Sequence, residues 1–133
     1  MMKVSEFKEY LESEFPSITF YNGAIDKSAK QCVGLYARGS GTPNIAIGGL
    51  QNTSYGTLPV TLLVHWSENS DTCEGIANSL YEHLHGLSSV TMDERKVYHV
   101  RLLDPAPVGI NRDSNNICEM VIRANIIYER EVS

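Results

Sequence analysis

The sequence predicts an α+β fold: a single antiparallel or mixed β-sheet of about five to six strands, with two helices packed on one face. Three observations lead to this prediction. Two segments repeat apolar residues at helical spacing, and several others alternate apolar and polar residues. Several of these strands follow one another without a helix between them, which favours α+β over alternating α/β folds. The length fits one domain, so we expect residues 1–133 to form a single unit.

The first helix is predicted over residues 4–15. Its apolar residues recur at helical spacing, and Pro16 ends it because proline disfavours helical geometry in the residue before it. Two strands follow, over residues 17–21 and 31–37. Gly34 weakens the second strand, which indicates a bulge or a close approach of another part of the backbone.

Residues 38–57 are predicted to form a flexible, glycine-rich loop. The segment is mostly irregular, although residues 44–47 could form a short strand within it. Irregular segments of about twenty residues are uncommon in compact domains and tend to be functional or disordered. A central strand over residues 58–66, with strict alternation of its apolar side chains, follows the loop.

The second helix is predicted over residues 72–84. Ser70 or Asp71 is expected to cap its start, with Glu74 completing a capping box. Gly86 is expected to end the helix in a left-handed conformation.

A strand over residues 97–103 comes next, with Tyr98, Val100 and Leu102 facing inward. The two prolines within residues 104–107 break it. No internal repeat or low-complexity tract interrupts the order of elements.

The last predicted strand, over residues 117–129, is the longest. At about 3.4 Å per residue it would reach roughly 40 Å, about twice a typical strand, so it must bend or extend beyond its own core to meet another molecule. Its outer face mixes charged and apolar side chains, which suits a contact between subunits. The expected contact residues are Glu119, Val121, Arg123, Ile127 and Glu129.

Composition excludes several classes of function. The net charge of −5 and the scattered basic residues argue against a nucleic-acid-binding surface. The four glutamates between residues 6 and 14 are typical of a solvated helix face. Three cysteines without paired spacing indicate a reducing compartment, and no apolar run suits a signal peptide or membrane span, so we expect synthesis in the cytoplasm.

No combination of residues predicts catalysis, a metal site or a cofactor. His83 and His85 point about 200° apart on their helix and cannot share a metal, and a zinc site from Cys73, His65 and His99 would need a chance convergence. The glycines lack the lysine and spacing of nucleotide-binding loops. Cys73 has no base placed beside it by the sequence, so we expect a structural thiol and no enzyme activity.

Taken together, the order of elements and several short sequence motifs resemble the minor capsid or tail terminator family of long-tailed bacteriophages. The motifs are Ile18-Thr-Phe-Tyr21, Val33-Gly-Leu-Tyr-Ala37, Leu62-Leu-Val-His-Trp66, the pattern of the second helix, and Pro107-Val-Gly-Ile-Asn-Arg-Asp113 before a strand ending Ile126-Ile-Tyr128. The resemblance covers nearly the whole chain, and its motifs have structural rather than catalytic content.

The resemblance implies a virion protein that caps the completed tail tube as a six-membered ring and offers a docking face to the head–tail connector. Implied partners are therefore further copies of the chain, the tail tube protein and the connector proteins, without sequence-specific nucleic-acid binding or a membrane. The glycine-rich loop is the expected partner contact. Its candidate residues are Arg38, Gly41, Asn44, Gly48, Gly49 and Tyr55.

Two alternatives remain open from the sequence. One is a head completion protein on the connector side, and the other is a small-ligand-binding α+β domain whose residues 38–57 close over a metabolite, which requires a deep apolar pocket. If Arg123 belongs to a ring contact, Arg123→Glu should weaken assembly and leave the fold intact.

Overall fold

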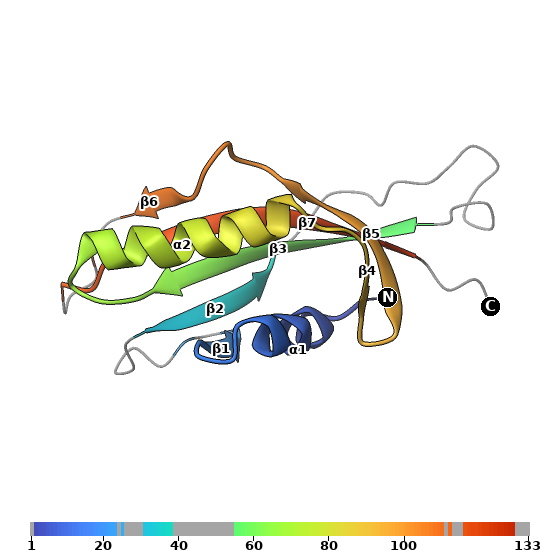
Figure 1. Ribbon diagram of the computed structural model, residues 1–133, viewed down its shortest axis with the longest axis horizontal. Helices are drawn as coiled ribbons and strands as arrows, with labels where there is room; N and C mark the ends of the chain where they lie inside the picture. Colours follow the sequence, from blue (N-terminus) through green and yellow to red (C-terminus); the bar gives the residue numbers. More distant parts are fainter. Residues whose placement is uncertain are drawn as a thin grey trace.

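The computed structural model describes residues 2–23, 25, 31–38, 55–110, 112 and 116–129. Two helices and seven strands form within these ranges, and all seven strands belong to one sheet (Figure 1). The elements are α1 (Val4–Glu14), β1 (Thr19–Asn22), β2 (Cys32–Ala37), β3 (Tyr55–His65), α2 (Ser70–His85), β4 (Ser88–Met92), β5 (Arg95–Leu102), β6 (Val108–Ile110) and β7 (Glu119–Glu129).

The centre of the sheet is the antiparallel pair of β3 and β7. These strands pair along all eleven residues, from Tyr55 opposite Glu129 to His65 opposite Glu119. The strand order is β1-β2-β3-β7-β5-β4, and β6 also pairs with β7. Only β1 and β2 pair parallel, so the sheet is mixed and the predicted fold class is confirmed.

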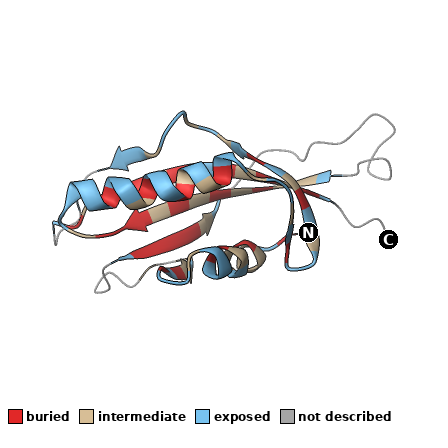
Figure 2. Ribbon diagram, viewed as in Figure 1, coloured by how far each residue is buried: buried red, intermediate tan, exposed pale blue. Residues whose placement is uncertain are grey.

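Both helices lie on one face of this sheet and share a single hydrophobic cluster with it (Figures 1 and 2). Alternation along the two central strands sends every second side chain into that cluster, as period-two burial requires. The buried apolar residues of these strands are Leu58, Val60, Leu62 and Val64 on β3, and Met120, Ile122, Ala124, Ile126 and Tyr128 on β7.

The helices cover different parts of the sheet. The buried stripe of α2 is Cys73, Ala77, Leu80 and Leu84, whose spacing of three and four residues keeps them on one side of the helix. The buried residues of α1 are Phe7 and Leu11. The hydroxyl of Tyr10 lies 2.8 Å from Nε2 of His83, and the ring of Phe15 meets the same imidazole edge-on, so the helices also touch each other.

Several strands differ from the sequence-based expectation. β3 begins at Tyr55, so residues 55–57 belong to a strand and not to the predicted loop. β4 and β6 form strands that the sequence did not predict. The possible strand over residues 44–47 lies outside the described residues.

The inward-facing set of β5 also differs, because the pairing of β5 with β7 shifts by one residue between Val97 and His99. Such a bulge places two residues of one strand opposite one of its partner. Val97 and Val100 therefore both enter the core, while Tyr98 is only half-buried. The predicted inward position of Tyr98 was wrong for that reason.

The N-cap residue of α2 and the conformation of its C-cap differ from those expected. Asn69 is the N-cap, and its side chain accepts hydrogen bonds from the backbone of Asp71 and Thr72. Gly86 follows the helix with φ −87° and ψ −2°, which is right-handed. No helix among the described residues is long and apolar enough to cross a membrane.

Gly34 sits in a regular pairing with Leu63, without a shift in register. A Cβ atom placed on it would lie 2.6 Å from Cγ2 of Ile25, so a side chain packs against this glycine. A close approach, rather than a bulge, explains the glycine, although it is made by a side chain and not by backbone.

Candidate assembly interface

The side chains that alternate away from the core form a second surface on the sheet, which we call the helix-free face. The registers of β2, β5, β6 and β7 place residues from five strands on it side by side. The helix-free face comprises Tyr36, Arg38, Tyr55, Thr57, Pro59, Thr61, Leu63, His99, Arg101, Val108, Ile110, Glu119, Val121, Arg123, Asn125, Ile127 and Glu129.

All five predicted contact residues of β7 lie on this face, but Glu119 is already used inside the subunit. Oε2 of Glu119 accepts a hydrogen bond from Nδ1 of His65, its direct cross-strand partner, at 2.9 Å. The His65 side chain is 1% exposed and that of Glu119 15% exposed. Glu119 therefore satisfies a buried imidazole, and an isolated buried polar group would be costly.

Arg123 is also paired within the chain. Its guanidinium donates two hydrogen bonds to Asp104, at 2.9 and 2.7 Å, in the bidentate geometry that favours arginine over lysine. Asp104 lies between β5 and β6, where the register with β7 jumps and residues 103–107 loop away from the sheet. The backbone carbonyl of Asp104 accepts a hydrogen bond from Tyr81 of α2 at 2.7 Å, which fixes this loop from the helical side.

The electrostatics of this loop follow from that pairing. The hydrogen-bonded Arg123 guanidinium lowers the pKa of the Asp104 carboxyl, and Asp104 in turn raises the pKa of Arg123. Burial lowers the pKa of Arg38, and the nearby charge of Arg123 lowers it further. The charges of Arg38 and Arg123 therefore repel each other, and the Asp104 carboxylate offsets part of this repulsion at Arg38.

The apolar part of the helix-free face runs along β6 and β7. Val121 is half-buried between Leu63 of β3 and Val108 of β6. Val108 is 41% exposed and Ile110 43% exposed, high values for large apolar side chains. The two residues are two positions apart on β6, so their side chains lie on the same face of the strand.

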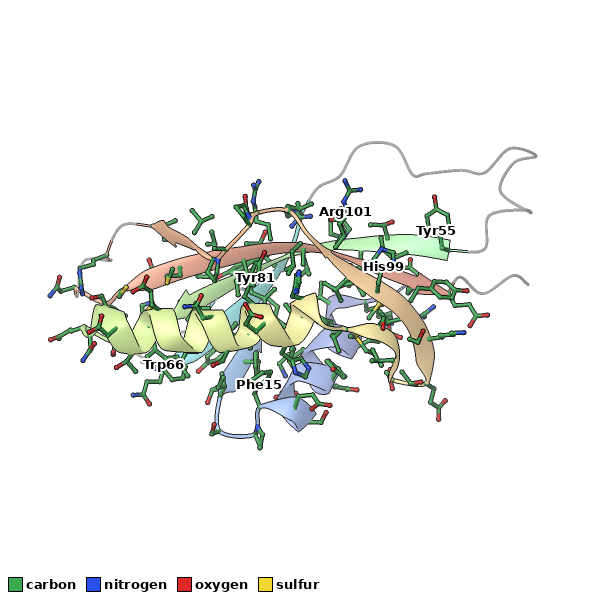
Figure 3. All side chains as sticks on the ribbon, turned by 45° about the horizontal axis from the view of Figure 1, so that its top comes forward. Phe15, Tyr55, Trp66, Tyr81, His99 and Arg101 are labelled. Atoms are coloured by element: carbon green, nitrogen blue, oxygen red, sulfur yellow. The ribbon has the colours of Figure 1, made fainter. Side chains whose placement is uncertain are left out.

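The other end of the face holds Ile127, Tyr55 and Glu129. Ile127 is half-buried between Thr57 and His99, and Tyr55 and Glu129 are exposed cross-strand partners. Figure 3 shows the side chains of Tyr55 and Arg101 directed away from the helices.

At Arg38, the residues predicted to contact partners through the loop meet the residues predicted to form the subunit contact on β7. Its guanidinium donates one hydrogen bond to the carbonyl of Val60 at 2.6 Å and another to the side chain of Asn125 on β7. Arg38 and Tyr55 thus adjoin the β7 residues on one face. The remaining predicted loop residues, Gly41, Asn44, Gly48 and Gly49, lie outside the described residues.

Three members of this face, and the loop residue Asp104 beside it, were not expected as contact residues from the sequence: Arg101, Val108 and Ile110. Val108 and Ile110 flank a glycine, and this apolar–glycine–apolar triplet was the available signal for a short strand. Arg101 alternates with Val100 and Leu102, which marks it as outward-facing. Asp104 carried no signal, because its partner is nineteen residues away.

The candidate chemical groups are accounted for structurally. No group of three or more His, Cys, Asp or Glu within the described ranges is arranged to hold a metal ion. Cys73 is buried, and its thiol donates to the carbonyl of Cys118 at 3.3 Å. Burial and hydrogen bonding to Cys118 raise the pKa of the Cys73 thiol to about 12, which opposes a role as a nucleophile.

Comparison with known proteins agrees with the resemblance noted in the sequence. The model of one family, described as bacteriophage tail terminator protein, matches residues 6–130. None of the curated proteins matches the chain. The match spans all the described secondary structure except the first two residues of α1. The chain therefore belongs to the bacteriophage tail terminator family.

Proposed function

We propose that this chain caps the completed tail tube of a phage as a six-membered ring and forms part of the interface to the head. The family match over residues 6–130 supports this proposal most strongly. A cap must stop the addition of tube subunits and then present a surface to the connector. The role is structural, without catalysis or a cofactor, and the protein is made in the host cytoplasm and carried in the virion.

The ring requires two different patches on each subunit, because head-to-tail contacts close into a ring only when the patches are distinct. The helix-free face is our candidate for one of them. Its exposed Val108 and Ile110 and half-buried Val121 supply apolar area, while Arg123 and Glu129 supply charge. Residues 38–57 are the proposed contact with the tube protein or the connector.

The acidic composition suits a channel for DNA. A ring of six chains, each with a net charge of −5, carries about −30 in total. Such a surface repels the phosphate backbone, so the genome would pass through the ring without binding to it.

Electron microscopy of lysates tests the cap directly. The phage that encodes this chain would carry a nonsense codon in its gene, and the full chain supplied in trans would be the control. Tubes of uncontrolled length beside separate filled heads are expected. Tails of normal length beside unjoined heads would move the protein to the connector side, and ordinary infectious particles would contradict a role in the virion.

The subunit contact needs a variant that does not disturb the fold. Arg123→Glu is unsuitable alone, because it places a second carboxylate against Asp104. Val108→Asp introduces a charge at a 41% exposed side chain on a strand of three residues, so its cost to folding should be small. The matched control is Thr91→Asp, exposed on β4 at the far edge of the sheet.

Ring assembly would be measured as the recovery of infectious particles in the complementation system, with thermal melting of each purified variant as the folding check. Val108→Asp should lower recovery at least about tenfold, since a buried unpaired carboxylate is costly in an interface. Thr91→Asp should leave recovery unchanged. Equal recovery for both variants would show that this part of the helix-free face is not a subunit contact.

A further inference from the structure

Two of the three cysteines meet in the folded chain. Cys73 lies in the first turn of α2, and Cys118 lies just before β7, 45 residues further along the sequence. The Cys73 thiol donates to the carbonyl oxygen of Cys118 at 3.3 Å, and the two thiols are also hydrogen-bonded to each other. This pair depends on the packing of α2 against the sheet, so the spacing of the cysteines along the chain could not reveal it.

The third cysteine, Cys32, is separated from this pair by the sheet. It lies opposite His65 in the register of β2 with β3, and His65 lies opposite Glu119, a residue of the helix-free face. Because directly opposite residues direct their side chains to the same side of a sheet, Cys32 points away from α2. Cys73 and Cys118, in contrast, pack with the hydrophobic cluster on the helical side. The fold therefore brings together these two thiols and not the third.

The backbone around Cys118 is held in place by hydrogen bonds. Its amide donates to the carbonyl of Ser67 at 2.8 Å, and its carbonyl accepts from the amide of Trp66 at 3.2 Å. Arg112 donates to the carbonyl of Glu68 at 2.9 Å, which ties the segment before Cys118 to the connection between β3 and α2. The partner thiol is carried by a helix. Little ordering of the chain is therefore needed to bring the two sulfurs together.

The two thiols differ in their access to solvent and in their acidity. Cys118 is half-buried, whereas Cys73 is fully buried. Burial and the hydrogen bond to Cys118 raise the pKa of the Cys73 thiol to about 12, against the opposing positive charge of Arg112. A buried, protonated thiol reacts poorly with a molecule from solution. An oxidant should therefore react first at Cys118, beside which Cys73 is already in place.

We infer that Cys73 and Cys118 form a disulfide when the folded chain meets a small-molecule disulfide such as oxidised glutathione. In the first step, the Cys118 thiolate attacks one sulfur of the oxidant, which forms a mixed disulfide and releases one glutathione thiolate. The Cys73 thiol then loses its proton to solvent, and its sulfur attacks the Cys118 sulfur and releases the second glutathione. The cysteines are oxidised by two electrons, and the oxidant is reduced to two thiols. Contact between the sulfurs offsets the small thiolate fraction of Cys73 in the closing step.

The disulfide acquires a role when the chain leaves the host. Thiols are kept reduced in the cytoplasm, so the chain would fold and assemble with both thiols free. A virion released by lysis leaves that environment, and the cross-link would then join α2 to the start of β7 in every subunit. This setting rests on the proposed function, whereas the site itself rests on the contacts between the two cysteines. A link that forms after assembly stabilises the subunit without interfering with its folding.

Oxidation of the purified full chain tests the site. The reduced protein would be incubated with oxidised glutathione at about pH 8.5, near the ordinary pKa of a cysteine thiol. It would then be alkylated in urea and examined by mass spectrometry and peptide mapping. A loss of about 2 Da, a peptide linking Cys73 to Cys118, and alkylation of Cys32 alone are expected. Cys118→Ser and Cys73→Ala should abolish the link, and the matched control Cys32→Ala should form it as the wild type does.

Thermal melting supplies the second measurement. Because the link joins residues 45 apart, it should raise Tm by about 5–15 °C, and dithiothreitol should reverse the rise.

The inference would be overturned by unreacted thiols, by a stable glutathione adduct on Cys118 without the link, or by a link that includes Cys32. A link between Cys73 and Cys118 that leaves Tm unchanged or lowers it would also overturn it, since a strained pair is not prearranged by the fold. Mapping of the wild type decides the question even if Cys73→Ala fails to fold. None of these results affects the proposed cap, which is judged by tail length in the nonsense lysate.

Discussion

Gly56 provides a sharp test of how the long central strands are packed. It lies directly opposite Tyr128 in the pairing of β3 with β7, and the tyrosine ring covers it. A Cβ atom at Gly56 would lie 2.5 Å from both Cζ and the hydroxyl oxygen of Tyr128. The ring is 4% exposed, and the Arg95 guanidinium lies 5.2 Å from its centroid, so the ring has little room to move.

Gly56→Ala should therefore destabilise the protein. An ordinary carbon–carbon contact of about 3.5 Å requires the ring to shift by roughly 1 Å, and overpacking of a buried site costs about 1–3 kcal/mol. Replacing glycine in a strand recovers about 0.5–1 kcal/mol of backbone entropy. The net loss is about 1–2 kcal/mol, which corresponds to a fall in Tm of roughly 4–8 °C for a chain of this size.

The assay is thermal and urea unfolding of four proteins that form a double-mutant cycle with Tyr128→Leu. Removing the ring should abolish the cost of alanine at Gly56, giving a coupling free energy of about 1–2 kcal/mol. Gly75→Ala is the control, because Gly75 is exposed in α2 with no heavy atom within 4 Å of an added Cβ, and it should gain about 1 kcal/mol. An unchanged Tm for Gly56→Ala, or a coupling below about 0.5 kcal/mol, would refute the packing described for these strands.

Three further predictions concern polar contacts. Glu119→Ala removes the carboxylate from buried His65 and should cost about 1–3 kcal/mol in urea unfolding, whereas a purely interfacial glutamate would cost nothing. Arg123 lowers the pKa of Asp104, so this pair stabilises the fold above pH 4, and the contribution is lost as pH falls through the lowered pKa. Carboxyl NMR titration should give Asp104 a pKa below 3.8, and Arg123→Gln should raise that pKa toward 3.8. An Asp104 titration midpoint that does not change in Arg123→Gln would exclude the pairing of Asp104 with Arg123. Asn69→Ala removes the N-cap of α2 and should lower the free energy of unfolding by about 1 kcal/mol, measured as a fall in Tm of roughly 3–5 °C. An unchanged Tm would show that the Asn69 side chain does not stabilise the start of α2.

The elements with strong periodicity were predictable from the sequence. β7 alternates apolar residues without interruption over its inner positions, so its buried face followed from period two, although the strand begins at Glu119, two residues after the predicted start. The helix stripes of α1 and α2 followed from spacings of three and four residues. These patterns also fixed the fold class, since two helices and successive strands leave few ways to bury one face each.

The two short strands were missed because they carry little local pattern. β4 buries only Met92, so its sequence does not alternate. Its turn to β5 is Asp93-Glu94, with φ of 49° and 64°, in place of the Asn-Gly or Asp-Gly pair that signals such a hairpin. The bulge in β5 is a property of its pairing with β7, so no window of β5 alone could identify Val97 as the inward residue.

The sequence predicted which side of β7 forms the candidate interface. It did not predict which side chains on that side are already bound within the subunit. Alternation correctly placed Val121, Arg123 and Ile127 on the surface opposite the core. It could not show that Arg123 binds Asp104 or that Glu119 binds His65, because these partners are nineteen and fifty-four residues distant. Such pairings depend on the register of the whole sheet.

The central claim, that this chain closes the end of the tail tube, is tested most directly by locating it on the tube. Tubes of uncontrolled length from the nonsense lysate would be incubated with the purified full chain carrying a gold label, and imaged by electron microscopy. The account predicts one cluster of label at a single end of each tube, followed by joining to added heads. Label along the tube wall, on the heads alone, or on neither would contradict it.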